Sequence, residues 1–202
     1  MSYGFAPEDY LIRARDRIKE NSPEGLFYAA LELRSYLEAR QHEYLSAQKE
    51  YAKSFPKLWE TTKQWKALKK VYANDIQHLQ MVFDGGWTLD AFHTPVTQAH
   101  KVSAERLSEY LHARTDHIPP RDPWWEKLRA DVEGVYRLSW LCHQGNLLSP
   151  ALLYCDKIQG SMALRLPAGE AEEYRQRLAV GAHFVVKVDY LSQPPGHWVV
   201  DI

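Results

Sequence analysis

Apolar residues recur every three or four positions through most of the first 144 residues, a spacing that predicts helices. A short amphipathic helix is expected over residues 7–20. A long helix is expected to begin after Ser22, whose side chain can cap it, and to continue until Pro56 breaks it. Three more helices are expected over residues 57–82, 97–114 and 122–144, with an irregular loop over residues 84–95. Together these segments predict a five-helix bundle.

The pattern changes after Pro150. Short apolar segments over residues 151–155 and 162–166 predict a β-hairpin, and a small helix is expected over residues 168–179. Apolar and polar residues alternate over residues 182–191, which predicts a strand, and residues 198–202 are expected to add a last one. The predicted fold class is therefore mainly α: a helical bundle over residues 1–148, with a small C-terminal α+β cap over residues 149–202 packed on it.

Composition and charge narrow the possible functions. The chain has 202 residues, of which 45% are hydrophobic, as expected for a soluble globular protein. The 25 Lys and Arg residues nearly balance the 26 Asp and Glu residues, so a nucleic-acid surface would have to be local. The chain shows neither an apolar run of about 18 residues, as a membrane span needs, nor a signal-peptide pattern, and it has only two cysteines. We therefore expect no membrane contact and a cytoplasmic location.

The most basic stretch of the chain lies between Lys49 and Lys70, with Trp59 and Trp65 interleaved among the lysines. Lysines can neutralise phosphates and aromatic rings can stack on unpaired bases, so this stretch is a candidate RNA-binding face. The alternative is the solvated face of an ordinary amphipathic helix. The candidate RNA-binding residues are Lys57, Lys63, Lys66, Lys69 and Lys70.

The nine histidines do not form a recognisable metal site. The sequence has no HExxH pair and no Cys/His spacing of a zinc finger, and Cys142, His143 and Cys155 do not match a known zinc pattern. A buried free thiol is the favoured interpretation of the cysteines. We therefore expect neither a metal nor another cofactor.

Arg106 and His112 form the one pair with a candidate mechanism. An imidazole can move the proton of a ribose 2′-hydroxyl while a guanidinium stabilises charge on the phosphate, so the pair could cut RNA without metal. On a regular helix, side chains six residues apart leave the axis about 120° apart. The pair would therefore converge only if the helix began late, bent, or met a second copy across a dimer. The alternative is a solvent-facing Arg106 with His112 as a capping or core residue.

Arg34 and Glu38 are spaced for an ion pair along the second predicted helix. If this pair is buried, it is expected to fix the packing of the bundle and to take no part in catalysis.

The segment SPEGLFYAALELRSYLEARQHEYL, the lysine-rich helix after it and the later SEYLHAR resemble the HEPN-like proteins of bacteria over about residues 22–141. HEPN domains are helical bundles that commonly dimerise. Many are metal-independent ribonucleases of toxin–antitoxin or antiviral systems, with an Arg-x4-6-His motif. Arg106 and His112 fit this spacing, but Leu107 stands where a polar residue is typical. Residues 150–202 have no counterpart in the resemblance.

The resemblance implies a homodimer with a role in bacterial defence or in a toxin–antitoxin system. Because relatives without a working motif serve as binding or dimerisation modules, we expect a non-catalytic module that binds a protein or RNA partner. The alternative is a metal-independent endoribonuclease that uses Arg106 and His112.

Overall fold

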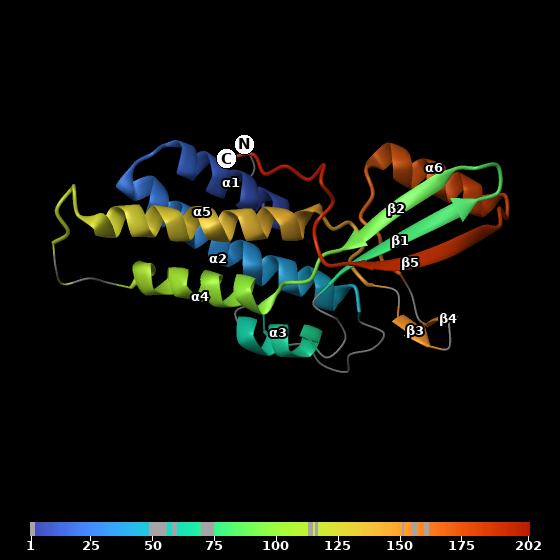
Figure 1. Cartoon of the computed structure of the whole chain (residues 1–202), viewed down its shortest axis with the longest axis horizontal. Helices are drawn as coiled ribbons and strands as arrows, with labels where there is room; N and C mark the ends of the chain where they lie inside the picture. The colour runs from blue at the N-terminus through green and yellow to red at the C-terminus, as the bar shows by residue number, and fades with distance from the viewer. Residues whose placement is uncertain are drawn as a thin grey trace. The chain divides into compact units, whose positions relative to one another are not determined.

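A computed structural model describes residues 3–48, 56–57, 60–69, 75–112, 115, 117–150, 152–154, 157–159 and 162–202 (Figure 1). The chain folds into two compact units, and each unit draws on separate stretches of the sequence. A helical unit consists of Met1–Val71, Val96–His143 and Gly196–Ile202, and a sheet unit consists of Tyr72–Pro95 and Gln144–Pro195.

The helical unit is arranged around α2 (Pro23–Ser46), on which the other helices of this unit pack. Figure 1 shows these helices with their long axes roughly aligned. The Ser22 and Thr97 side chains cap α2 and α4 by accepting hydrogen bonds from backbone N–H groups of the first turn. The other helices of the unit are α1 (Pro7–Lys19), α3 (Thr61–Lys69), α4 (Gln98–Leu111) and α5 (Pro123–Gln144).

The sheet unit is a three-stranded antiparallel sheet with strand order β2-β1-β5. Gly85 and Gly86 both adopt positive φ angles in the turn between β1 and β2. Alternate side chains of β1 form a core with α6, where the Phe83 ring contacts Tyr174. The elements are β1 (Ile76–Phe83), β2 (Thr88–His93), β3 (Leu152–Tyr154), β4 (Lys157–Gln159), α6 (Ala168–Ala179) and β5 (Phe184–Leu191).

The mainly α fold with an α+β part is confirmed: the described residues form six helices and the three-stranded sheet. The helices expected over residues 7–20, 122–144 and 168–179 are present, as is the strand within residues 182–191. No helix in the described parts of the chain is both long enough and apolar enough to span a membrane.

The predictions for residues 57–95 were largely wrong. The expected helix over residues 57–82 is reduced to α3, and β1 occupies the end of that range because Leu79, Met81 and Phe83 are buried at every second position. The expected loop over residues 84–95 contains β2. The second helix ends at Ser46, well before Pro56. The division of the chain differs from the predicted boundary at residue 148, because the β1–β2 hairpin belongs to the sheet unit.

The predicted strand pairings after Pro150 were also wrong. β3 pairs with β4, whereas residues 162–166 contribute only an isolated bridge between Leu164 and Leu147. Residues 198–202 form no strand and belong to the helical unit. There the carbonyl oxygen of Asp201 accepts a hydrogen bond of 3.2 Å from the Tyr136 hydroxyl, which holds this segment on α5.

Candidate nucleic-acid interface

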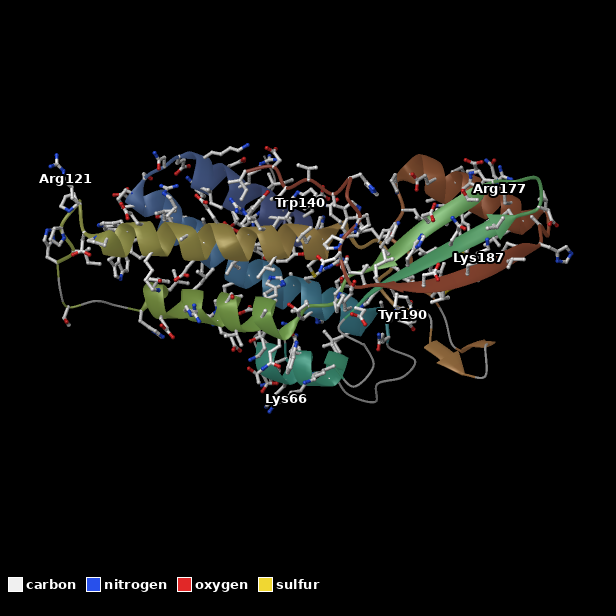
Figure 2. The ribbon with its side chains drawn as sticks, viewed as in Figure 1. Lys66, Arg121, Trp140, Arg177, Lys187 and Tyr190 are labelled. Carbon is white, nitrogen blue, oxygen red and sulfur yellow. The ribbon has the colours of Figure 1, made fainter. Side chains whose placement is uncertain are left out.

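Three of the candidate RNA-binding lysines lie on the exposed side of α3. Gln64 and Leu68 are the buried residues of this helix, and Lys63, Lys66 and Lys69 are exposed. Because they are spaced by three residues, these lysines lie within about 120° of the helix circumference. Figure 2 shows Lys66 on the outer side of α3. Lys57 is exposed just before the helix, and Lys70 lies outside the described residues, as do Lys49, Lys53 and Trp59.

Trp65 brings a further lysine to this surface. Its indole N–H donates a hydrogen bond of 3.0 Å to the carbonyl oxygen of Val96, which fixes the ring between α3 and the start of α4. The ammonium nitrogens of Lys69 and Lys101 lie 5.0 Å and 5.8 Å from the ring centroid, within range of cation–π attraction. The ring therefore gathers positive charge from two helices. Sequence reasoning missed Lys101, because its distance along the chain from Lys69 gives no signal of this contact.

Two glutamates partly balance the lysines. Glu60 pairs with Lys63 and accepts a hydrogen bond from the backbone N–H of Lys57, and these contacts lower the pKa of the Glu60 carboxyl. Glu105 accepts hydrogen bonds from Thr62, at 2.9 Å, and from Lys101, at 2.6 Å. The lysine surface consists of the exposed Lys57, Lys63, Lys66 and Lys69 and of Lys101, whose side chain is only 12% exposed and pairs with Glu105. With Glu60 and Glu105 as the two acidic partners, this surface keeps an excess of positive charge.

Arg106 and His112 are both exposed near the end of α4. Arg106 lies within the helix, which begins at Gln98, and His112 is the C-cap with an extended backbone. Six residues of helix correspond to about 9 Å of rise and about 120° of rotation. The two side chains could converge within one copy if the helix began after Arg106. It begins at Gln98, so this condition is not met.

Arg34 and Glu38 form the expected ion pair, with 3.4 Å between Nε and Oε1. The Arg34 side chain is 46% exposed, so the pair lies at the surface of α2 and not in the core. Burial raises the pKa of Glu38 in spite of the attraction of Arg34. An exposed pair of this kind contributes about 0.3–0.5 kcal/mol to stability.

The arginine that is buried in α2 is Arg40, which sequence reasoning missed. Its side chain is fully buried, pairs with Glu43 and donates a hydrogen bond of 3.0 Å to the carbonyl oxygen of Cys142 on α5. Its guanidinium carbon also lies 4.4 Å from the centroid of the Tyr44 ring. A signal was present, because Arg40 falls on the apolar stripe that Leu37 and Tyr44 define.

A second polar contact in the same core joins α4 to α5. His100 Nε2 lies 2.9 Å from Ser139 Oγ, and the Tyr36 hydroxyl donates a hydrogen bond of 2.8 Å to the carbonyl oxygen of Ser139. Burial lowers the pKa of His100 to about 4, so its imidazole is neutral at neutral pH. A serine beside a histidine is an arrangement found in nucleophilic catalysis. Here both side chains are buried, so this contact stabilises the helix packing and offers no access to a substrate.

The aromatic residues at the start of α5 close one end of the helical unit. The Trp125 ring contacts Phe27 and Trp124, and its indole N–H donates a hydrogen bond of 3.0 Å to the carbonyl oxygen of Pro119. Beside Trp125 lies a hollow of about 440 Å³, whose lining includes Pro23, Phe27 and Ile118. These tryptophans thus have packing partners within their own unit.

Comparison with known proteins identifies no relative. No protein-family model, no curated protein and no solved structure matches this chain. The HEPN-like resemblance therefore stays a prediction.

Proposed function

We propose that this chain is a non-catalytic module that binds RNA through the phosphate backbone, using the lysine surface of α3 and α4. The observation that carries the proposal is the convergence of Lys69 and Lys101 on Trp65, beside the exposed Lys63 and Lys66. Ammonium groups collected on one surface attract phosphates and release their counterions. A local surface of this kind is compatible with a net charge of −1 for the whole chain.

The expectations drawn from the HEPN-like resemblance belong to the same proposal. They are a bundle of the HEPN type, a homodimer, a cytoplasmic location and a role in a toxin–antitoxin or antiviral defence system. Binding without cleavage is favoured over the endoribonuclease because Arg106 lies within α4 and His112 lies six residues later at its C-cap, a spacing that separates side chains by about 120° on a regular helix. RNA is favoured over a protein partner because three lysines gather on the exposed side of α3.

The test is binding of a fluorescein-labelled single-stranded RNA of about 20 nucleotides, followed by anisotropy at 50 mM and 200 mM salt with EDTA present. We expect the charge reversal K63E/K66E/K69E to weaken binding at least tenfold. Each lost phosphate contact also removes about 0.7 from the slope of log affinity against log salt, so the slope becomes shallower.

A matched control reverses three exposed arginines on other helices or loops of the same unit, R17E/R121E/R137E, with the same change in net charge. We expect this control to change affinity less than threefold. Equal losses in both variants, or no binding by the wild-type chain, would contradict the proposal. RNA that is cut by the wild type and left intact by His112→Ala would support the endoribonuclease instead.

A further inference from the structure

The two edges of the sheet differ in their backbone pairing. At the β2 edge, the N–H of Phe92 donates to Asn146 Oδ1 at 2.8 Å, and its carbonyl oxygen accepts from the N–H of Leu147 at 3.0 Å. β5 forms the opposite edge. Among the described residues, no backbone group hydrogen-bonds to the side of β5 that faces away from β1. The strand contains no proline. An edge strand of eight residues whose outward backbone groups are not covered is a template for another strand.

The register of β1 and β5 shows which β5 groups face outward. The N–H of Asp84 donates to the carbonyl oxygen of His183 at 3.0 Å, so hydrogen bonds to β1 fall on His183 and on every second residue after it. The N–H and carbonyl groups of the residues between them therefore point away from β1. These residues are Phe184, Val186, Val188 and Tyr190.

The side chains of β5 carry a charge pattern of their own. Lys187 and Asp189 are both exposed and share the face of the sheet opposite the core, because they are two residues apart. Val186 and Val188 pack on the core side. Along the same strand Val185 is 63% exposed and Tyr190 is 53% exposed. Figure 2 labels Lys187 and Tyr190 on this strand.

We propose that β5 is an interface with a second copy of this chain, whose β5 adds antiparallel across a two-fold axis at Val188. In this register Lys187 lies opposite the partner's Asp189, and Asp189 lies opposite the partner's Lys187. Val188 lies opposite the partner's Val188, and the outward N–H and carbonyl groups of the two residues bond each other. The neighbouring pairs, which carry the charges, are therefore non-hydrogen-bonded pairs, in which facing side chains are closest. The two sheets then form one antiparallel sheet of six strands.

Charge complementarity selects this register over its neighbours. A two-fold axis at residue 187 would place Lys187 opposite a second Lys187, and an axis at residue 189 would oppose two aspartates. Only the axis at Val188 places unlike charges directly across the interface while keeping nearly the full length of β5 paired. This inference rests on the dimerisation part of the proposed function, whose surface it names, and it is independent of RNA binding.

Sedimentation equilibrium of the full chain between 1 and 100 µM tests the interface. We expect the wild type to dimerise. K187D places aspartates opposite aspartates and D189K places lysines opposite lysines, so each should weaken the dimer at least tenfold. Mixing the two single variants should give a heterodimer, and K187D/D189K should restore the homodimer, because both combinations place unlike charges across the axis again.

A monomeric wild type at 100 µM would overturn the interface together with the dimer of the proposed function. A dimer that K187D and D189K leave unchanged would overturn the β5 interface alone, and dimerisation through another surface would stand. Circular dichroism of each variant, with RNA binding as a second readout, separates loss of the interface from loss of the fold. RNA affinity per chain should stay within threefold of the wild type in the charge-swapped double variant.

Discussion

At the scale of single residues, the core of the helical unit depends on polar side chains placed among apolar ones. Arg40 is held by Glu43, by a carbonyl oxygen of α5 and by the face of Tyr44. A buried charge costs several kcal/mol in desolvation unless such partners compensate, so its net contribution to stability is small even though its loss would be costly. Its geometry links α2 to α5 at one defined register.

The buried His100 makes stability depend on pH. Its pKa of about 4 lies below the value of about 6.5 for an exposed histidine, so the unfolded chain binds the proton more tightly than the folded one. The stability that the neutral His100 gives the folded chain is fully present above pH 6.5 and is lost as the pH falls toward 4. We expect a loss of about 3 kcal/mol from this group.

Urea unfolding between pH 7.5 and pH 4.5 measures this loss. His100→Gln keeps an amide near the position of Nε2, so it can still bond Ser139, and it should remove most of the difference between the two ends of this range. His112→Gln, at an exposed position, is the control and should leave the wild-type pH dependence in place. If the free energy of unfolding of His100→Gln depends on pH as strongly as that of the wild type, the pH dependence comes from carboxylates and not from His100.

The sequence predicted the exposed part of the candidate site better than the buried part. Lysines on a short helix are visible as a local pattern, and Arg34–Glu38 follows from the helix spacing alone. Which arginine is buried depends on how α5 packs on α2, and the convergence of Lys69 and Lys101 depends on where α4 lies against α3. Contacts between distant segments leave no such local pattern in one sequence.

At the scale of elements, two helical glycines differ in whether a larger side chain would fit at their position. A Cβ on Gly25 would lie 2.6 Å from the carbonyl oxygen of Arg17, so the start of α2 depends on a close approach to the end of α1. A Cβ on Gly134, inside α5, would meet nothing within 4 Å. Alanine is favoured over glycine inside a helix by about 1 kcal/mol.

We therefore expect Gly134→Ala to raise the free energy of unfolding by up to about 1 kcal/mol and Gly25→Ala to lower it by at least as much. The steric conflict at Gly25 involves a backbone atom, which cannot move away as a flexible side chain can. Guanidinium unfolding of both variants measures the difference. A gain in stability from Gly25→Ala would show that α1 and α2 can separate at no cost.

The wrong helix over residues 57–82 has a physical cause. Ile76 and Leu79 are three residues apart, which suits a helix, whereas the buried set of β1 includes Gln77 and its opposite face carries Ile76 and Val82. Apolar residues on both faces blur the alternation that would predict a strand. Where the pattern was clear, as in α5, α6 and β5, the sequence was sufficient to predict the element.

At the scale of the whole molecule, the chain returns to the helical unit after completing the sheet unit. Residues 196–202 lie with that unit, where the Asp201 carboxylate is 3.6 Å from Arg15 and 3.7 Å from Lys19. The Tyr136 hydroxyl bonds the backbone of the same residue. The terminal segment thus contributes to the stability of α1 and α5.

Removing residues 197–202 should lower the stability of the helical unit by at least about 1–2 kcal/mol, because one hydrogen bond and weak surface ion pairs are lost together with the half-buried Trp198. Native-state hydrogen exchange should show faster exchange in α1 and α5, with β1 unchanged. A chain that lacks only Ile202 is the matched control and should exchange like the full chain. Faster exchange in β1 as well would mean that the segment stabilises more than its own unit.

The separate stretches that make up each unit have a consequence for inheritance. The chain passes from one unit to the other at residues 71–72, 95–96, 143–144 and 195–196. Neither unit is therefore encoded by one uninterrupted piece of gene, and recombination at a single point cannot transfer one unit to another protein without part of the other. A protease that cuts the chain once also leaves both units covalently joined. Moving one unit alone into another protein would take at least two separate exchanges of sequence.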